Sequence, residues 1–225
     1  MTTETSGDPK VSICGQIYNQ SAWAREMIET VIAQTYANWE LIMVDDGSTD
    51  GLKEVFDSFN DPRLKYLRFD ENRNVPLGTN VALKAATGKY VCLAAADERF
   101  YHTKLYDQVQ YLEAHPKVDC CWGLPGNGND KYPMGPRPEW EQYALGAHNR
   151  SKYAWLRTLV QLEGVPIGGC GLMMKKSVMD ELGGMNETLT LFSDHELYCR
   201  FFEKYIGVII PIRVAVDRPF AENLN

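Results

Sequence analysis

The clearest fold signal in the chain is QTYANWELIMVDDGSTD, residues 34–50. Its apolar centre, residues 41–44, is short and continuous, which is typical of a strand buried on both faces of a sheet. The apolar run ends at Asp45 and Asp46, and Gly47 with Ser48 then indicates a turn. The segment therefore predicts a buried strand with two carboxylates at its carboxyl end.

Strands and helices alternate on either side of this segment. We expect strands at residues 11–17, 64–69 and 90–95. We expect a first helix that is N-capped by Ser21 and carries on one face Trp23, Met27, Val31 and Ile32. A second helix is marked by Leu52, Val55, Phe56 and Phe59. A third is expected at residues 77–86, with Gly88 as its C′ residue. Such alternation predicts an α/β fold with a largely parallel, doubly wound sheet.

The second half of the chain is less regular. We expect helices at residues 104–113, 153–162 and 194–205, and strands at residues 118–122 and 171–175. Residues 123–146 are rich in Gly, Pro and Asn and have little periodicity, which is typical of a long functional or disordered loop. Neither an internal repeat nor an interdomain linker is evident, so one domain is expected.

The composition of the chain argues against some classes of function. A length of 225 residues suits one α/β domain, and the net charge of −7 argues against a broad nucleic-acid surface. The six cysteines form no CxxC pair, which indicates buried free thiols in a reducing compartment and no zinc site. The sequence has no apolar run of about 18 residues and no signal-peptide pattern. We expect a disordered tail at residues 1–9, and the end at residues 221–225 is compatible with a domain cut from a longer protein.

The carboxyl ends of the predicted strands are the places to look for a ligand site, because parallel α/β sheets bind ligands there. Asp45 and Asp46 can accept hydrogen bonds from a nucleobase imide or a ribose hydroxyl; the alternative is an N-cap for the next helix. Asp97 and Glu98 follow the strand at residues 90–95 and suit a hard cation such as Mg²⁺ or Mn²⁺. The alternative for that pair is an exposed acidic turn.

Two further groups lie in the second half. Asp194 and Glu196 open the helix at residues 194–205 and point in different directions, so one can face a cleft while the other supports the fold. The alternative is a pair of first-turn acids that complement the helix dipole. Residues 168–171, Gly-Gly-Cys-Gly, would let a ligand approach the backbone closely, and a tight turn is the alternative.

The order of motifs resembles that of the family 2 glycosyltransferases, which have the GT-A fold. The resemblance is carried by residues 11–19 with their Tyr18-Asn19 turn, residues 34–50, residues 72–80 with 86–90, residues 183–187, and residues 194–197. Each motif alone is weak evidence, whereas five in the right order are strong. The resemblance covers residues 10–212.

The resemblance implies a single GT-A domain at residues 10–220, with a Rossmann-like, mostly parallel sheet flanked by helices. Residues 10–100 would hold the nucleotide sugar, and residues 101–220 the acceptor. The implied nucleotide-binding residues are Ile17, Tyr18, Asn19, Asp45, Asp46, Asn80 and Ala96. The implied metal ligand is Asp97, the implied catalytic base is Asp194, and the implied sugar and acceptor residues are Gly168, Gly169, Asp97, Glu98 and His195. The activity implied is inverting transfer from a nucleoside-diphosphate sugar, with a UDP-sugar favoured.

The chain also departs from the family pattern. Ala95 stands where the DxD motif has its first Asp, so the metal would rest on Asp97, with help from Glu98. Thr79 stands where the family often has Arg before Asn80, and residues 216–218, Val-Asp-Arg, occupy a region where some members have His. Ala95 supports the alternative of a non-catalytic binding module, whereas Asp194 argues for an enzyme.

Other classes fit less well. A phospho-acceptor signalling domain needs its acidic pair after the first strand, and here the pair follows the second. The chain has neither a P-loop nor a GxGxxG motif, which argues against an ATPase or a dehydrogenase.

The resemblance further implies the partners. They are a nucleoside-diphosphate sugar donor, a divalent cation, Mg²⁺ or Mn²⁺, and a glycan, lipid-linked or protein acceptor from cell-surface polysaccharide biosynthesis; nucleic acid is not expected. We expect a cytoplasmic protein without a transmembrane segment, peripheral at the membrane only through other domains or partners. Residues 123–146 are expected to form a lid or wall on the acceptor side.

Overall fold

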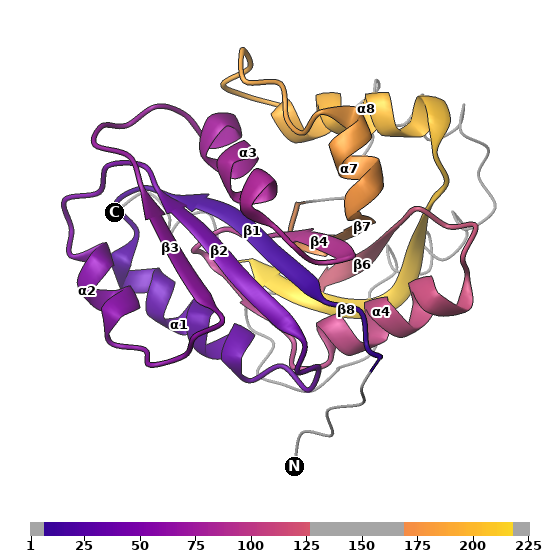
Figure 1. Cartoon of the computed structure of the whole chain (residues 1–225), viewed down its shortest axis with the longest axis horizontal. Helices are drawn as coiled ribbons and strands as arrows, with labels where there is room; N and C mark the ends of the chain where they lie inside the picture. The colour runs from indigo at the N-terminus through magenta and orange to yellow at the C-terminus, as the bar shows by residue number, and fades with distance from the viewer. Residues whose placement is uncertain (1–6, 127–168, 218–225) are drawn as a thin grey trace.

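Eight strands form one sheet at the centre of the computed structural model, which describes residues 7–126 and 169–217 (Figure 1). The strands are β1 (Val11–Ile17), β2 (Trp39–Asp45), β3 (Leu64–Arg68), β4 (Tyr90–Leu93), β5 (Glu98–Phe100), β6 (Cys120–Gly126), β7 (Leu172–Lys175) and β8 (Gly207–Asp217). Their order across the sheet is β3-β2-β1-β4-β7-β6-β8-β5. β3, β2, β1 and β4 are parallel, so the doubly wound half is confirmed.

The other half of the sheet is mixed. β7 is antiparallel to both β4 and β6, β8 is parallel to β6, and β5 is antiparallel to β8. β6 continues to Gly126 and therefore takes in the start of the segment that we expected to be a loop from residue 123. The rest of that loop, and the helix expected at residues 153–162, lie outside the described residues.

Helices cover both faces of the sheet (Figure 1). α1 (Ser21–Ile32), α2 (Leu52–Asp57) and α4 (Lys104–Ala114) contribute Met27, Phe56 and Leu112 to one buried apolar cluster. α3 (Val75–Ala85), α7 (Lys176–Leu182) and α8 (Ser193–Lys204) contribute Leu83, Met179 and Phe201 to a second one. The continuous apolar strands predicted from the sequence are thus packed on both faces, as β2 shows with every residue buried.

Two local predictions were wrong. Ser21 is the first residue of α1 and Gln20 is its N-cap, because Ser21 instead donates its backbone N–H and its hydroxyl to Asp50, at 2.7 and 2.9 Å. Gly88 is not a C′ residue in the left-handed conformation. A Cβ on Gly88 would lie 2.6 Å from Lys10 O, so this glycine permits a close approach to the chain at the start of β1.

A buried carboxylate joins the amino ends of the parallel strands. Glu40 is 1% exposed and accepts hydrogen bonds from Ser12 Oγ at 2.6 Å, Lys65 Nζ at 2.7 Å, Thr87 N at 2.8 Å and Lys10 Nζ at 2.9 Å. Burial alone would raise the pKa of Glu40, but the hydrogen bonds from Lys65, Ser12 and Lys10 outweigh it and hold the pKa well below its ordinary value. Glu40 thereby connects β1, β2 and β3 with the turn before β4.

Three remaining expectations concern the ends of the chain, the thiols and the membrane. The sequence predicts a disordered tail that includes residues 8 and 9, and this is wrong for these two residues. Asp8 O accepts a hydrogen bond from Asn38 Nδ2 at 2.7 Å and Pro9 O accepts one from the Tyr36 hydroxyl at 2.5 Å, so the chain is held from Asp8 onward. All six cysteines are free thiols, as expected, and only Cys199 is not fully buried. Within residues 7–126 and 169–217, no helix combines the length and apolar character needed to cross a bilayer.

Candidate functional site

The carboxyl ends of β1, β2 and β4 lie side by side at one edge of the sheet. Ile17 is level with Asp45 in the pairing of β1 with β2, and Cys14 is level with Leu93 in the pairing of β1 with β4. The residues that follow these strands therefore share one edge, as the sequence pattern predicted. They include most of the predicted nucleotide-binding residues and the predicted metal ligand.

Asp45 is buried at the centre of the turn after β2. Its Oδ1 accepts a hydrogen bond from Ser48 N at 2.7 Å, and its Oδ2 accepts from the hydroxyl of Tyr66 and the guanidinium of Arg68. Burial alone would raise the pKa of Asp45, but the hydrogen bonds from Ser48 and Tyr66 and the charge of Arg68 hold it below its ordinary value. Burial and the bond to Asp45 raise the pKa of Tyr66 to about 12. Asp45 is therefore a charged anchor of this turn.

Asp46 is also buried, with 1% exposure. Its carboxylate accepts hydrogen bonds from Arg73 N at 2.8 Å and from Gln16 Nε2 at 2.9 Å. Each carboxylate oxygen can accept more than one hydrogen bond, although a nucleotide reaches Asp46 only by displacing neighbouring atoms. The N-cap alternative for the two aspartates is wrong, because the N-cap of α2 is Gly51. Nucleotide contact by Asp46 stays a prediction.

The turn after β1 is joined to the turn after β2. Asn19 N donates to Ser48 Oγ at 2.9 Å, and Thr49 N donates to Asn19 Oδ1 at 2.9 Å. Asn19 has a φ of +49°, in the left-handed region that asparagine adopts more readily than most residues. Ile17 is buried, whereas Tyr18 is 43% exposed, so the Tyr18 ring is the part of this turn that can meet a ligand.

The loop between β4 and β5 carries the predicted metal ligand. Asp97 is half-buried there and follows the buried Ala96, whereas Glu98 begins β5 and its carboxylate accepts from Ala95 N at 3.1 Å. In the described part of the chain, no three His, Cys, Asp or Glu side chains are grouped as ligands of one ion. Mg²⁺ and Mn²⁺ bind through one or two carboxylates when phosphates and waters supply the other oxygens. The residues therefore fit a cation shared with a diphosphate.

The glycine-rich turn lies against the end of β4. Gly169 begins a single 3₁₀ turn, η2 (Gly169–Gly171), and a Cβ on Gly169 would meet Leu93 at 3.9 Å. The alternative of a tight turn is thus confirmed, while contact with a sugar stays a prediction. Gly168 lies outside the described residues.

Two buried side chains of α4 hold this turn, and neither is among the site residues expected from the sequence. Lys104 is fully buried, donates to Cys170 O and lies over the Phe100 ring at 4.3 Å, while Gln108 Nε2 donates to Gly171 O at 2.8 Å. The available signal was their spacing. Lys104 and Gln108 lie four residues apart, on the buried face of α4.

Asp194 lies in the first turn of α8, half-exposed beside His195. Its Oδ1 accepts from His195 N at 2.8 Å and lies 3.1 Å from His195 Nδ1. Within the described residues Oδ2 accepts no hydrogen bond, so one oxygen is held and the other is open. Glu196 instead pairs with Arg200, at 2.6 Å. The two acids thus have different partners, and Glu196 supports the fold, while a cleft facing Asp194 stays a prediction.

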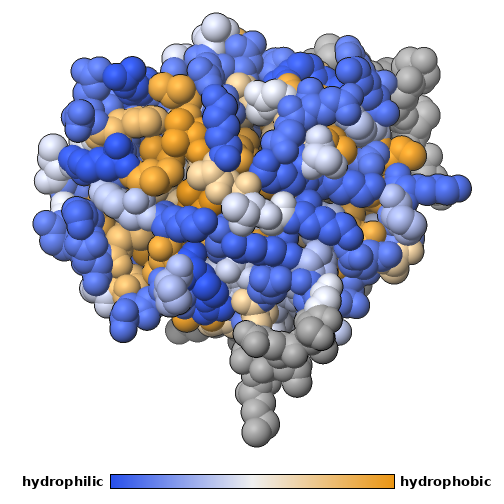
Figure 2. Space-filling view, viewed as in Figure 1, coloured by the Kyte–Doolittle hydropathy of each residue, from blue (hydrophilic) through white to orange (hydrophobic). Residues whose placement is uncertain are grey.

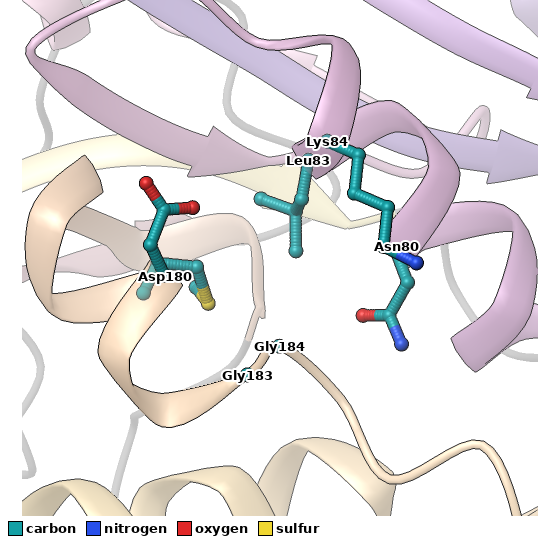
Figure 3. A pocket seen from close by; sticks show the side chains of 7 residues that line it. Asn80, Leu83, Lys84, Asp180, Gly183 and Gly184 are labelled. Carbon is teal, nitrogen blue, oxygen red and sulfur yellow. The ribbon is translucent and has the colours of Figure 1, made fainter.

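Asn80 joins α3 to the turn that precedes α8, beside a pocket of about 160 Å³ (Figure 3). Its Oδ1 accepts from Met185 N at 2.8 Å, and its Nδ2 donates to Met185 O at 2.9 Å and to Glu187 Oε1 at 2.8 Å. The turn contains Gly183 and Gly184, both with positive φ. Because both ends of the Asn80 amide are used, the geometry gives Asn80 a structural role, and its predicted contact with the nucleotide stays a prediction.

Arg200 holds the same turn from the other side. Its guanidinium donates to Gly184 O at 2.8 Å and to Leu182 O at 2.5 Å while it also binds Glu196. The turn is therefore fixed between α3 and α8. The position of the first turn of α8, with Asp194, depends on this arrangement.

A separate groove of about 570 Å³ lies beside α3, where Figure 2 shows an apolar area among hydrophilic side chains. It is lined by Arg68, Phe69, Asp70, Glu71, Arg73, Leu77 and Val81. Arg68 and Arg73 place it next to the two buried aspartates. Neither Tyr18 nor Asp97 lines it, so we do not assign the nucleotide to this groove.

Comparison with known proteins gives a family. The sequence profile described as "Glycosyl transferase family 2" matches residues 12–182. An uncharacterized glycosyltransferase of Rickettsia felis is 35% identical over 114 residues, which is 50% of this chain and 19% of that protein. The putative glycosyltransferase EpsE of Bacillus subtilis is 36% identical over 110 residues, which is 48% of this chain and 40% of EpsE. The chain thus spans well under two thirds of the length of these relatives.

Solved structures share the fold. The S. aureus TarS 1–349 structure in complex with UDP has a TM-score of 0.72 at 16% identity, over 95% of this chain and 62% of TarS 1–349. The mannosyltransferase PcManGT from Pyrobaculum calidifontis, in complex with GDP-Man and Mn²⁺, has a TM-score of 0.68 at 22% identity, over 96% of this chain and 59% of PcManGT. These neighbours are GT-A-type glycosyltransferases, and the predicted fold class is confirmed.

Proposed function

The chain belongs to glycosyl transferase family 2, and on that premise we propose that it transfers a sugar from a nucleoside-diphosphate sugar to an acceptor hydroxyl with inversion at the anomeric carbon. One observation carries the proposal: the family match at residues 12–182 includes the strand ends that hold Tyr18, Asp46 and Asp97 at one edge of the sheet. A UDP-sugar is the favoured donor. The UDP complex of a protein with the same fold supports that choice.

The donor would lie across the ends of β1, β2 and β4. The exposed ring of Tyr18 would contact the base, and Asp46 would accept a hydrogen bond from the base or ribose. Asp97 would hold a divalent cation, which when bound neutralises the diphosphate as it leaves. The Mn²⁺ complex of the Pyrobaculum enzyme supports a divalent cation, and Ala95 leaves Asp97 as the carboxylate in the usual DxD position.

Asp194 would be the general base. Its open Oδ2 would take the proton of the acceptor hydroxyl while the hydroxyl oxygen attacks the anomeric carbon in line. The bond from that carbon to the diphosphate breaks, and the nucleoside diphosphate leaves with the electron pair. Asp194 lies beyond the stretch matched by the family, so its role rests on its geometry beside His195. The acceptor would be a glycan or lipid-linked sugar of the cell surface. The putative teichuronic acid biosynthesis glycosyltransferase TuaG of Bacillus subtilis, which is 30% identical over 110 residues (48% of this chain and 44% of TuaG), supports that choice.

A second candidate function is a nucleotide-binding module without catalysis. Ala95 favours it, because this residue removes one of the two carboxylates that usually flank the metal. The two functions differ in what they predict for the metal and for turnover. The transferase requires a cation and turns over a nucleotide sugar, whereas the module binds nucleotide without a cation and turns nothing over.

The test is calorimetric titration of UDP, and then GDP, with and without Mn²⁺, combined with release of UDP from UDP-sugars. We expect Mn²⁺-dependent UDP binding that Asp97→Ala abolishes. We expect Asp194→Asn to keep UDP binding and to lower turnover at least 100-fold, in line with the loss of a general base.

The matched control is Asp107→Asn, which removes another first-turn acid, in α4, and should leave turnover unchanged. UDP binding that ignores Mn²⁺, with no turnover of any UDP-sugar, would favour the binding module. Binding of neither nucleotide would contradict both functions.

A further inference from the structure

Two large apolar side chains are exposed shortly before the predicted base, from which Ser193 separates them in the sequence. Leu191 is 73% exposed and Phe192 is 62% exposed, and they are adjacent in sequence. They are the most exposed large apolar residues in the described part of the chain. Exposed apolar side chains placed together often mark a surface that binds something.

The backbone at Phe192 is held in an unfavourable conformation. Its φ is +59° and its ψ is 22°, in the left-handed region that bulky residues rarely adopt. Phe192 is the N-cap of α8, but its side chain cannot cap, and only its carbonyl accepts, from Glu196 N at 3.0 Å. Neither capping nor burial explains a phenylalanine here, and strained residues of this kind concentrate at functional sites.

The Phe192 ring is connected to the predicted base through one neighbour. It packs edge-to-face on His195, with ring centroids 5.6 Å apart and an angle of 85° between the planes. His195 in turn contacts Oδ1 of Asp194 at 3.1 Å, and no residue that the structure describes donates a hydrogen bond to Oδ2. Whatever rests on Phe192 therefore lies next to the group that would receive the acceptor proton.

We propose that Leu191 and Phe192 form an acceptor platform that holds the C–H face of the pyranose ring bearing the reacting hydroxyl. This inference rests on the proposed function and names its acceptor class. The face of an aromatic ring is electron-rich and attracts the polarised C–H groups of a sugar, while the ring of Phe192 loses little side-chain entropy on binding. The hydroxyl must come within about 3 Å of Asp194, so the ring that bears it is the group next to the platform.

A membrane surface fits this position less well. Residues 177–199 contain Asp180, Glu181, Glu187, Asp194 and Glu196 but no Lys or Arg. Anionic lipid headgroups attract basic segments and repel acidic ones. The lipid tail of a lipid-linked acceptor is also separated from the reacting hydroxyl by its sugar and phosphate groups.

The experiment is saturation-transfer NMR on the full chain with UDP and Mg²⁺ present, with irradiation of the aromatic protons. The probes are methyl β-D-glucopyranoside, methyl α-D-mannopyranoside and methyl N-acetyl-β-D-glucosaminide. We expect transfer to the ring C–H protons of at least one glycoside. Phe192→Leu, which keeps apolar bulk but loses the ring, should reduce this signal at least fivefold, and Phe192→Tyr should retain it.

Two controls make the outcomes distinct. Tyr106→Leu removes an aromatic ring of similar exposure, 48%, on α4 and should leave the glycoside signal unchanged. The UDP signal should be equal in all variants. Absence of a UDP signal from the wild type would contradict the proposed function itself.

Three results would overturn the platform while leaving the proposed function intact. One is UDP binding without binding of any glycoside, and another is a glycoside signal that Phe192→Leu does not change. The third is wild-type co-sedimentation with vesicles of phosphatidylcholine and phosphatidylglycerol that Leu191→Ser with Phe192→Ser abolishes. That last result would make the two residues a membrane contact.

Discussion

Gly47 and Gly51 have the same left-handed backbone conformation in the turn after β2, but they differ in the space around them. Gly47 has a φ of +81°, and a Cβ there would lie 2.9 Å from the backbone carbon of Glu71. Gly51 has a φ of +84°, and the nearest atom to a Cβ there would be Glu54 Oε2 at 3.7 Å. We expect Gly51→Ala to lower the free energy of unfolding by about 1 kcal/mol and Gly47→Ala by about 3 kcal/mol, measured by urea denaturation.

The difference between the two losses in the free energy of unfolding measures the clash at Gly47. Both variants introduce the same kind of backbone strain, so each is a control for the other. Gly47→Ala should also weaken UDP binding, since the clash pushes on the segment whose Arg73 N binds Asp46. Equal destabilisation by both variants would mean that the backbone at Glu71 moves aside without cost.

For single residues, the sequence predicts where they lie in the fold better than it predicts their hydrogen-bond partners. The alternation of strands and helices was enough to place Tyr18, Asp45 and Asp46 at one edge of the sheet. It could not supply Tyr66 and Arg68 as the partners of Asp45, because those residues come from a strand that is separate in sequence and only the register of β2 with β3 brings them together.

Among the elements, the turn between α7 and α8 offers the sharpest test. Gly183 and Gly184 have φ values of +77° and +75°, yet a Cβ on Gly183 would meet nothing within 4 Å, whereas one on Gly184 would strike the Asn80 amide. We expect Gly183→Ala to lower the free energy of unfolding by about 1 kcal/mol in urea denaturation, because backbone strain is its only cost. Gly184→Ala should break the tie to α3 and lower turnover at least tenfold with UDP affinity unchanged, because α8 carries Asp194.

Calorimetry and UDP release from a UDP-sugar separate these effects. If Gly184→Ala weakened UDP binding as much as turnover, Asn80 would contact the nucleotide, as the family resemblance implied, and would do more than hold the turn. If both glycine variants had full turnover, the turn would not position α8.

Most elements could be predicted, and the exceptions have physical reasons. β5 is three residues long, too short for a periodic pattern. α7 begins directly where β7 ends, at Lys175, without a turn residue to mark the change. β8 contains Pro211 and the buried Arg213, so it does not read as a continuous apolar strand.

For the molecule as a whole, Glu40 links stability to pH. Its pKa is lowered on folding, so its contribution is fully present above the ordinary value of 4.5 and is lost as the pH falls through the lower folded value. We expect Glu40→Gln to cost about 3 kcal/mol at pH 7, because it removes a buried charge from two lysines, and clearly less at pH 3.5. Urea denaturation at both pH values measures the difference.

Glu54→Gln is the matched control, because Glu54 is an exposed glutamate on α2, and its effect should be small at both pH values. The same loss at pH 7 and pH 3.5 for Glu40→Gln would show that the hydrogen-bond geometry, and not the charge, is what matters. This network could not be predicted from the sequence, since its members come from four separate segments of the chain.

The pairing of β5 with β8 affects the order in which parts of the sheet can form during synthesis. Glu98 directly follows Asp97, and among the described strands its strand pairs with β8 alone, at Ala215, Val216 and Asp217. During synthesis the parallel half of the sheet leaves the ribosome first and can fold while translation continues. The loop that carries Asp97 gains its neighbouring strand only after β8 has emerged. A nascent chain can therefore form its first strands long before this neighbouring strand is in place, and the proposed cation site would be completed only when nearly all of the described chain has been made.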